Sequence, residues 1–328
     1  MIEGKKIFIT GGAGYLGRNL ISRYVKSNEI TVYSRDESKH YYLSKDFPSV
    51  RFVLGDIRDE SHLVRSCRDH DIGIFAASLK QIDCCSRNPK EAFETIIRGA
   101  FNSRLAAIEN EFESACFVST DKSRAATTVY GAMKYVAGES FILNNSEFRT
   151  RFTTAIYGNV MNSTGSLIPL IWKAIKEGIC LELYHQEMTR FMLSIEEAID
   201  LIELSLSLRD VNVLPVAKSF LVKDVFDIYK EKFGMKYRMG MPRANEKIHE
   251  IMASSEEIPR MRYLENYNAY VMSPVAEGNC KLKFESNEYS SKDSVLTKDQ
   301  MLEHLDKNEF YHGSHGAWSS GDARKSRT

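Results

Sequence analysis

The first 160 residues of this chain alternate between short apolar runs and longer amphipathic stretches. The apolar runs have the length and composition of strands: 6–10, 30–34, 51–54, 72–76, 116–120 and 153–157. The stretches between them have the spacing of helices: 15–27, 37–46, 60–69, 89–110 and 130–145. Strands and helices that alternate in this way predict an α/β fold built on a doubly wound parallel sheet.

The pattern loosens after residue 160, where helices are predicted at 168–177, 195–208 and 221–233 and a strand at 211–216. We expect one domain at 1–160 and a smaller region at 161–311. That region would pack on the C-terminal edge of the sheet and return some strands and helices to its core. Residues 312–328 are rich in Gly, Ser and Arg, which predicts a disordered tail.

Composition excludes several classes of protein. The 44 basic and 44 acidic side chains cancel, so no overall field favours nucleic acid or an anionic membrane. No apolar run approaches the ~20 residues of a membrane span, and we expect a cytoplasmic protein. The six cysteines, including the adjacent Cys84 and Cys85, form no CxxC pair and no Cys/His cluster. Neither a metal site nor a disulfide framework is therefore expected.

A glycine-rich turn, GGAGYLG, follows the first predicted strand. Its Gly11, Gly14 and Gly17 fit a variant of the dinucleotide-binding fingerprint. Glycines there permit a tight turn, let the backbone approach a pyrophosphate, and let the next helix pack closely on the sheet. The helix N-terminus supplies N–H donors for the phosphates. The position of the turn favours a cofactor site over a purely structural turn, so residues 1–160 are predicted to be a Rossmann domain.

The second predicted strand ends in Ser34 and Arg35, where an acidic residue is usual for NAD. A guanidinium can bind a 2′-phosphate in bidentate fashion, which favours NADP over NAD. The alternative is a solvated surface arginine whose charge Asp36 partly offsets. Asp56, after the third strand, can accept a hydrogen bond from an adenine amino group. Helix capping by Asp56 or Asp59 is the competing interpretation.

Tyr130 and Lys134 form the first candidate catalytic device. They are four residues apart, which places both side chains on one face of a helix. A lysine ammonium can lower the pKa of the tyrosine and bind the nicotinamide ribose. The phenolate can then take the proton of an alcohol whose hydride leaves to the cofactor. This pair predicts an oxidoreductase step.

Thr120, Asp121 and Lys122 form the second candidate device, at the sheet edge where open α/β folds bind ligands. Oxidation of an alcohol needs only the hydroxyl, which holds the substrate oxygen. An additional acid and base suit an elimination. Once C4 of a sugar is a ketone, Lys122 can remove the acidified C5 proton, and Asp121 can protonate the C6 hydroxyl as it leaves. A strand-end ion pair is the simpler alternative.

With these motifs the chain resembles the extended short-chain dehydrogenases, and more narrowly the inverting UDP-N-acetylglucosamine 4,6-dehydratases of polysaccharide biosynthesis. The similarity covers about residues 5–260. It is carried by VYSRDE (32–37), AASLKQ (76–81), NPKEA (88–92), STDK (119–122), VYGAMK (129–134), YGNV (157–160), MTRF (188–191) and NEKIHE (245–250).

The resemblance implies a tightly held NADP, a UDP-sugar bound between two lobes, and a homo-oligomer. It implies Tyr130 as the base for C4 oxidation, supported by Lys134, with Thr120 on the C4 oxygen. Asp121 and Lys122 would be the elimination acid and base, with reprotonation of C5 on the opposite face giving an L-configured product. The remaining cofactor contacts would be Tyr15, Leu16, Ile57, Ala76, Ala77 and Lys80. The substrate contacts would be Lys80, Asn159, Arg190, Arg243 and Glu246.

The chain departs from the family pattern at Gln81, Ser86, Ile96 and Ile156, which bears on the sugar that is bound. Two alternative functions follow from the same residues. A nucleotide-sugar 4-epimerase or ketoreductase would carry out no elimination and would give Asp121 no evident task. A non-catalytic NADP-binding protein would have no use for a phenol at the nicotinamide.

Overall fold

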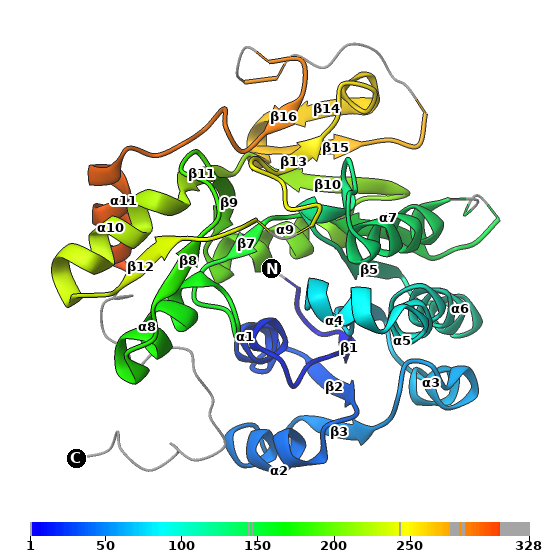
Figure 1. Cartoon of the computed structure of the whole chain (residues 1–328). Coiled ribbons are helices and arrows are strands. Elements are labelled where there is room, and N and C mark those ends of the chain that lie inside the picture. The colour runs from blue at the N-terminus through cyan, green and yellow to red at the C-terminus, as the bar shows by residue number, and fades with distance from the viewer. Residues whose placement is uncertain are drawn as a thin grey trace.

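The computed structural model describes residues 2–143, 145, 147–242, 244–275, 282–283 and 286–308. A nine-stranded sheet lies at its centre, in the order β14-β15-β10-β6-β5-β4-β1-β2-β3 (Figure 1). Neighbours from β10 to β3 pair in parallel, whereas β15 and β14 add antiparallel at the edge. The predicted doubly wound parallel sheet is confirmed. The strands are β1 (Lys6–Thr10), β2 (Glu29–Ser34), β3 (Arg51–Leu54), β4 (Ile72–Phe75), β5 (Ser114–Val118), β6 (Arg151–Ala155), β10 (Val211–Pro215), β14 (Met261–Leu264) and β15 (Ala269–Met272).

Helices cover both faces of this sheet, because alternate side chains of each strand point to opposite sides. In β1, Ile7 and Ile9 enter one apolar core, whereas Phe8 enters the other. The first core is closed by α1 (Tyr15–Tyr24) and α9 (Ile195–Ser207). The second core is closed by α3 (Glu60–Ser66), α6 (Gly99–Glu109) and α7 (Val129–Ile142).

The segment between β4 and β5 is more broken than its sequence predicts. The single helix expected at 89–110 consists of α5 (Pro89–Phe93), a π-helical turn at Glu94–Arg98, and α6. A further short helix, α4 (Ile82–Arg87), precedes it, and its six residues are too few to show an apolar period. The remaining helix of this half, α2 (Glu37–Asp46), begins at Asp36, whose carboxylate accepts from the backbone N–H of Lys39.

A smaller lobe forms beside the sheet from later parts of the chain (left of Figure 1). Its core includes Phe226, Tyr229, Met301 and Leu305. Its helices are α8 (Leu167–Glu177), α10 (Val222–Phe233) and α11 (Lys298–Lys307). The short strands outside the main sheet are β7 (Asn159–Val160), β8 (Leu181–Leu183), β9 (Thr189–Leu193), β11 (Lys218–Leu221), β12 (Tyr237–Met239), β13 (Ile251–Ala253) and β16 (Tyr289–Ser290).

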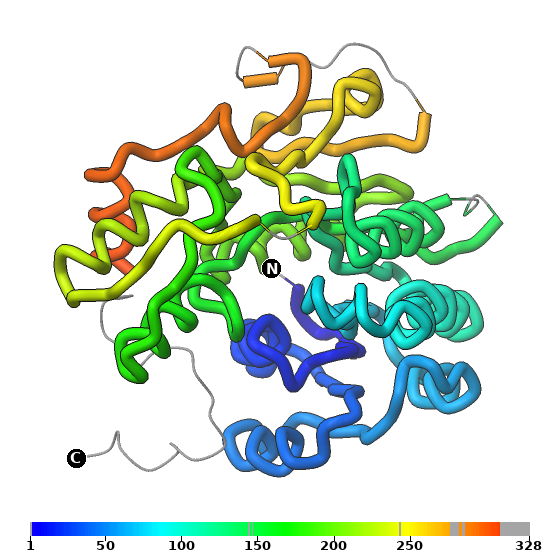
Figure 2. Tube along the Cα trace, viewed as in Figure 1, coloured from blue at the N-terminus to red at the C-terminus, as the bar shows by residue number. Residues whose placement is uncertain are grey.

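The second half of the chain also completes the central sheet. Strands β10, β15 and β14 come from residues 211–272, yet they extend the sheet begun by the first six strands (Figure 2). The domain boundary expected at residue 160 and the substrate-binding region at 161–311 stay predictions. The tail predicted at 312–328 lies outside the described residues.

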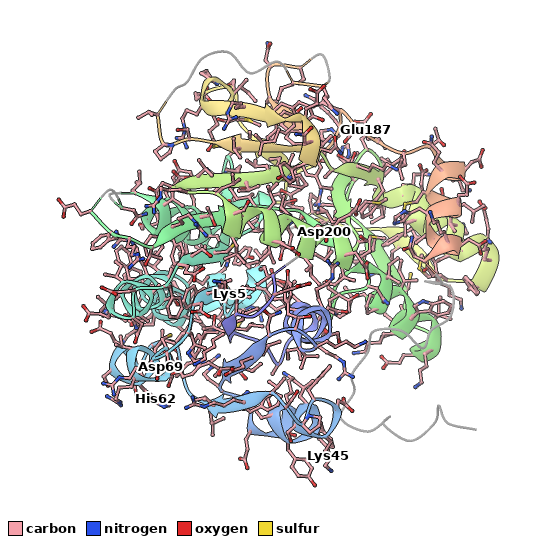
Figure 3. The ribbon with its side chains drawn as sticks, turned by 180° about the vertical axis from the view of Figure 1, so that it is seen from behind. Lys5, Lys45, His62, Asp69, Glu187 and Asp200 are labelled. Atoms are coloured by element: carbon pink, nitrogen blue, oxygen red, sulfur yellow. The ribbon has the colours of Figure 1, made fainter. Side chains whose placement is uncertain are left out.

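The outer surface of the sheet and its helices carries charges of both signs. Lys45, Asp69, Glu187 and Asp200 are exposed, and Figure 3 shows them spread over the rear of the molecule. Asp200 on α9 also pairs with Arg23 on α1 at 2.9 Å, which joins the two helices on this face. In the part of the chain that the structure describes, no helix is both long and apolar enough to cross a bilayer.

Candidate active site

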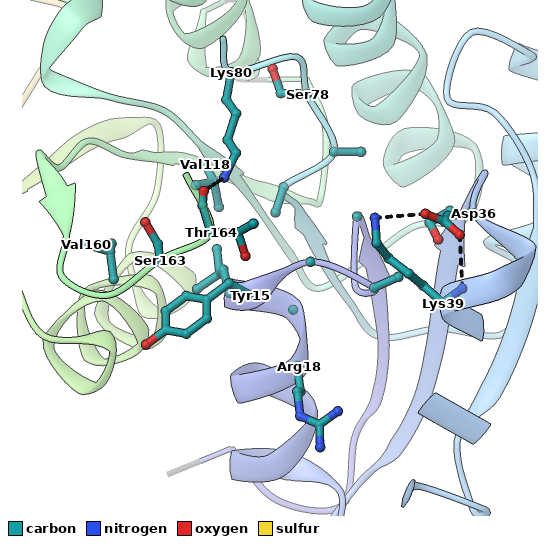
Figure 4. Close-up of a pocket in the computed structure, with 18 of the residues that line it drawn as sticks. Tyr15, Arg18, Asp36, Lys39, Ser78, Lys80, Val118, Val160, Ser163 and Thr164 are labelled. Carbon is teal, nitrogen blue, oxygen red and sulfur yellow. Dashed lines mark hydrogen bonds and ion pairs between the residues drawn. The ribbon is translucent and has the colours of Figure 1, made fainter. Parts of the chain in front are cut away.

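A cleft of about 1350 Å³ runs along the carboxyl ends of the parallel strands. Its walls come from the turns that follow β1, β2, β4, β5 and β6, and from residues 162–164 of the smaller lobe (Figure 4). The cleft is larger than the ~300–1,000 Å³ typical of small-ligand pockets, which suits a ligand of dinucleotide size.

The glycine turn after β1 forms one wall of the cleft, and its backbone leaves no room for side chains. Gly11 has a φ of +71°, and a Cβ there would lie 2.9 Å from the backbone of Ala77. A Cβ on Gly17 would lie 2.3 Å from the Cα of Gly12. Gly14 precedes α1 and offers no side-chain cap to its N–H groups. This cradle fits a pyrophosphate. The predicted contacts that line it are Gly11, Gly14, Tyr15, Leu16 and Gly17.

The end of β2 forms the part of the cleft where the adenosine ribose is expected. Ser34 Oγ lies 2.6 Å from Nε2 of the buried His40, so the hydroxyl is held by a neighbour on α2. Arg35 is about half exposed, at 53%, and its guanidinium lies 3.5 Å from Asp56. Lys39 lines the cleft close by and pairs with Asp36 at 2.8 Å (Figure 4). Two cations therefore flank this end of the cleft.

The carboxylate of Asp56 interacts with neighbouring arginines. Its carboxylate accepts from Nε and Nη2 of Arg58, at 2.9 and 2.6 Å, and it is not among the described residues that line the cleft. Asp59, rather than Asp56, caps α3, by accepting from the backbone N–H of His62. Asp56 thus orients Arg58 and Arg35 in this structure.

Lys80 crosses the cleft from the loop after β4. Its Nζ donates to the backbone carbonyl of Thr164 at 2.5 Å (Figure 4), and burial lowers its pKa. The loop that carries Thr164 turns sharply, because Asn162 and Gly165 have φ angles of +59° and +77°. This loop was not predicted as part of the site, although its Asn and Gly are residues that favour such turns. The other predicted contacts Ile57, Ala76 and Ala77 also line the cleft.

Tyr130 and Lys134 lie on α7 at the inner end of the cleft, and both are buried. Burial raises the pKa of Tyr130 to about 12, and the charge of Lys122 opposes this effect. Lys134 donates from Nζ to the carbonyl of Val118 at 2.8 Å and lies 4.4 Å over the ring of Phe117. Burial lowers the pKa of Lys134 to about 7. The cation that favours the phenolate here is Lys122, whereas the four-residue spacing suggests Lys134 for that effect.

Thr120, Asp121 and Lys122 follow the end of β5 and enter a 3-10 turn at Asp121–Ser123. Thr120 Oγ1 donates to Oδ1 of Asp121 at 3.0 Å, and Lys122 Nζ donates to the same oxygen at 3.2 Å. Asp121 is fully buried, and its Oδ2 accepts no hydrogen bond from any residue that the structure describes. Burial raises the pKa of this carboxyl, although Lys122 opposes the effect.

Glu250 completes this group and was not predicted. Its Oε1 lies 3.1 Å from Lys122 Nζ, and its side chain is only 4% exposed. Burial alone would lower the pKa of Lys122, but Asp121 and Glu250 together hold it above its ordinary value. Glu250 is the last residue of the NEKIHE motif, which is the only signal the sequence offers for it.

Two of the predicted substrate residues, Arg190 and Glu246, lie beside the same group. Arg190 on β9 donates to Glu246 Oε1 at 2.5 Å, and its Nε lies 3.6 Å from Glu250 Oε1. Asn159 lines the cleft with an Oδ1 that accepts no hydrogen bond within the described residues. Neither Arg190 nor Glu246 is among the described residues that line the cleft. Arg243 lies outside the described residues.

Comparisons with known proteins agree with this geometry. Residues 7–271 match the polysaccharide biosynthesis protein family. The chain is 35% identical over 286 residues to a UDP-N-acetylglucosamine 4,6-dehydratase (inverting) of Campylobacter jejuni, with 84% of each chain covered. It is 33% identical over 284 residues to a UDP-glucose 4-epimerase of Rickettsia bellii, covering 81% of this chain and 83% of that one. The X-ray structure of Pen from Bacillus thuringiensis has the same fold, with a TM-score of 0.87 at 24% identity, covering 94% of this chain and 98% of that one.

Proposed function

Because the chain belongs to the polysaccharide biosynthesis protein family, we propose that it is an NADP-dependent UDP-N-acetylglucosamine 4,6-dehydratase that inverts C5. One observation carries this proposal. The partly buried Lys122 and the fully buried Asp121 form an ion pair close to Tyr130, at the inner end of a cleft that fits a dinucleotide. An enzyme that only oxidises and reduces C4 has no need of that pair.

In the proposed reaction, Tyr130 takes the proton of the C4 hydroxyl while Thr120 holds that oxygen. A bound nicotinamide would supply the hydride acceptor for C4 and the hydride donor for C6, so no external oxidant would be needed. Lys122 takes the C5 proton, and the electron pair forms the C5–C6 double bond. Asp121 gives its proton to the C6 hydroxyl, which leaves as water. Protonation of C5 on the opposite face gives the L-configured product.

The nucleotide part of the substrate would bind beyond this group. Arg190 and Arg243 are proposed to pair with the diphosphate oxygens, and Glu246 to accept from ribose hydroxyls. Asn159 has a carbonyl oxygen free of partners among the described residues and faces the cleft, where the sugar or diphosphate would lie. Lys80 would contact both cofactor and sugar. We propose a homo-oligomeric, cytoplasmic enzyme.

NADP is proposed as the cofactor because Ser34 and Arg35 line the cleft at the end of β2, where an arginine can accommodate a 2′-phosphate in dinucleotide-binding folds. Replacing Arg35→Ser removes a charge-assisted hydrogen bond of about 1.5–3 kcal/mol, so the Kd for NADP should rise by about 10- to 100-fold. The Kd for NAD should change little, since its ribose carries no phosphate. Titration of both cofactors by fluorescence measures this, and an equal loss for both would exclude a role of Arg35 in selecting NADP.

The reaction itself is tested by incubation with UDP-N-acetylglucosamine in heavy water. The proposal predicts loss of one water from the sugar and uptake of deuterium at C5, both visible by mass spectrometry and NMR. A product of unchanged mass with inverted C4 would instead establish a 4-epimerase, the activity that the name of the Rickettsia relative suggests. No turnover of any UDP-hexose would favour a non-catalytic NADP-binding protein.

The assignment of Lys122 is tested by Lys122→Ala. The variant should bind NADP normally and lose dehydration, because no other amine is proposed to take the C5 proton. Dehydration at the wild-type rate would show that another group is the base.

A further inference from the structure

The ammonium of Lys122 is shared by two carboxylates rather than one. Asp121 Oδ1 lies 3.2 Å from Nζ on one side, and Glu250 Oε1 lies 3.1 Å from it on the other. Both carboxylates are almost completely shielded from solvent, with side-chain exposures of 0% and 4%. Asp121 and Lys122 have roles in the proposed elimination, whereas Glu250 has none so far.

Backbone hydrogen bonds of Glu250 hold this residue in place. Its N–H donates to Ser291 Oγ at 2.9 Å, and its carbonyl accepts from the N–H of Ser291 at 2.8 Å. These contacts fix the residue that directly precedes β13, and β13 lies against the 3-10 turn that carries Lys122. The carboxylate is therefore delivered to the lysine by the later part of the chain.

Other charged groups surround the same carboxylate. Arg190 Nε lies 3.6 Å from Oε1, and Lys247 Nζ lies 4.0 Å from Oε2. Glu246 pairs with Nη2 of Arg190 at 2.5 Å, and the charges of Lys122 and Asp121 act on the Tyr130 phenol. Oε2 of Glu250 accepts no hydrogen bond from the described residues. With several cations around it, Glu250 is the member of this group that is best stabilised as an anion.

An isolated pair of Asp121 and Lys122 would favour the wrong protonation states for elimination. In an ion pair the carboxylate has no proton to give, and the ammonium has no lone pair with which to take one. A second anion beside the ammonium changes this, because the lysine no longer needs Asp121 as its counter-ion. Asp121 can then keep a proton, and the lysine can pass its own proton to the second carboxylate across 3.1 Å.

We propose that Glu250 is a positioning residue for the elimination, which acts through Lys122 by serving as its counter-ion and proton acceptor while Asp121 keeps the proton that it gives to the leaving hydroxyl. This inference rests on the dehydratase function proposed above. Protons balance throughout: one moves from Lys122 to Glu250, one from C5 to Lys122, and one from Asp121 to the departing water. Asp121 ends as a carboxylate and Glu250 as an acid.

At Asp121 and Glu250 the directions of the pKa shifts agree with this division. The two carboxylates outweigh burial and raise the pKa of Lys122, so its proton moves to Glu250 only as the C5 proton is taken. The pKa of Asp121 is raised by burial and further by the charge of Glu250, against the effect of Lys122. The pKa of Glu250 is lowered, because Lys122, Arg190 and Lys247 outweigh the effect of its burial. Two carboxylates whose pKa values are driven apart around one amine form an acid and a counter-ion, which is a common arrangement in acid–base catalysis.

The test compares Glu250→Gln with Glu246→Gln. Both remove one charge next to Arg190, but only Glu250 also touches Lys122. In Glu250→Gln we expect kcat for dehydration to fall about 100-fold or more, the size of a lost general acid–base contribution. Oxidation at C4 should persist, so the absorbance of reduced nicotinamide should build up after substrate is added. The affinity for UDP, measured by calorimetry, should not change.

The control and the pH profile separate this role from a structural one. Glu246→Gln should raise KM and weaken UDP binding while kcat stays the same. In Glu250→Gln the fall of kcat at high pH should move to lower pH, because Asp121 loses its proton more easily. Glu250→Asp keeps the charge and should restore part of the lost rate, which also guards against a folding defect in the glutamine variant.

Three results would overturn the inference. The first is that Glu250→Gln dehydrates the substrate with the wild-type kcat. The second is that it loses UDP binding in parallel with activity, which would mean that Glu250 acts by orienting Arg190 for substrate binding. The third is that Glu250→Asp is as inactive as the glutamine variant, which would show that the negative charge at residue 250 is not what supports the elimination. If the wild-type protein itself releases no water from the substrate, the dehydratase function and this inference are both overturned. That result is distinguishable from the three above, because in each of them the wild-type protein is an active dehydratase.

Discussion

Gly131 sits at the contact that brings the two catalytic devices together. It follows Tyr130 in the first turn of α7, and a Cβ built on it would lie 2.1 Å from the backbone carbonyl oxygen of Lys122. Ordinary contact begins near 3.4 Å, so Gly131→Ala must move α7 and the 3-10 turn apart by about 1.3 Å. Tyr130 and Lys122 lie on opposite sides of the contact and must move with it.

Two opposing terms set the effect on stability. Alanine is favoured over glycine in a helix by at most about 1 kcal/mol, which would stabilise the variant. Overpacking against a rigid backbone atom costs about 1–3 kcal/mol. We expect the second term to win, with a net loss of about 1–2 kcal/mol in the free energy of unfolding. A misplacement of about 1 Å between reacting groups lowers rates by roughly 100-fold, so dehydration should fall by that order.

Urea unfolding and the dehydration assay measure the two effects. Gly138→Ala is the matched control, since it lies on the same helix but the three atoms nearest its Cβ would belong to side chains: the Thr154 methyl group at 3.3 Å and the hydroxyl oxygens of Thr154 and Ser119 at 3.8 Å. The control should keep its activity and lose little or no stability. If Gly131→Ala proves as stable and as active as the control, the close approach of α7 to Lys122 does not position the site.

Two further predictions concern buried charges. Because burial lowers the pKa of Lys134 from 10.5 to about 7, the unfolded chain binds more protons between those pH values, and wild-type stability should rise with pH there. In Lys134→Met that rise should be absent. Any excess in the free energy of unfolding of the variant over the wild type near pH 7 should therefore shrink by pH 10. Urea unfolding of both proteins over this range measures the difference, and a difference that does not change with pH would contradict the prediction. Arg124 is buried and pairs with Glu139 at 2.9 Å and Glu257 at 2.6 Å. Arg124→Ala leaves Glu257 without a cation among the described residues, whereas Glu139 keeps Arg260 at 3.5 Å. The substitution should cost about 3–5 kcal/mol of unfolding free energy, and a loss below about 1 kcal/mol would show that the pairs stabilise little.

Local pattern in the sequence was sufficient for the parallel strands of the sheet, β1 to β6 and β10, and for one wall of the cleft. Strand and helix periods repeat within about 20–30 residues, and the glycine turn lies directly between β1 and α1. The cradle of Gly11 and Gly17 follows from steric rules that hold wherever a chain turns so tightly. The same rules apply to the turn at Gly165, which was not interpreted because no periodic element was evident around it.

Contacts between distant segments could not be predicted in this way. Glu250 reaches Lys122 only because β13 crosses the turn after β5, and periodicity carries no information about such crossings. The sequence position of Asp56 is compatible with either a ligand contact or a helix cap. Its hydrogen bond with Arg58 depends on side-chain packing, which the sequence pattern does not show. The antiparallel strands β14 and β15 were missed because they are four residues each and follow an irregular stretch.

The interleaved order of the central sheet has a consequence for how the protein is made. When β6 leaves the ribosome at Ala155, its open edge lacks the strand that will cover it, because β10 begins only at Val211. Unpaired strand edges are sites of association between nascent chains. A prematurely terminated product of about 160 residues would keep this edge exposed, and we expect it to aggregate or to be held by chaperones. Co-expression of the missing segment from a second gene would then be a way to rescue it.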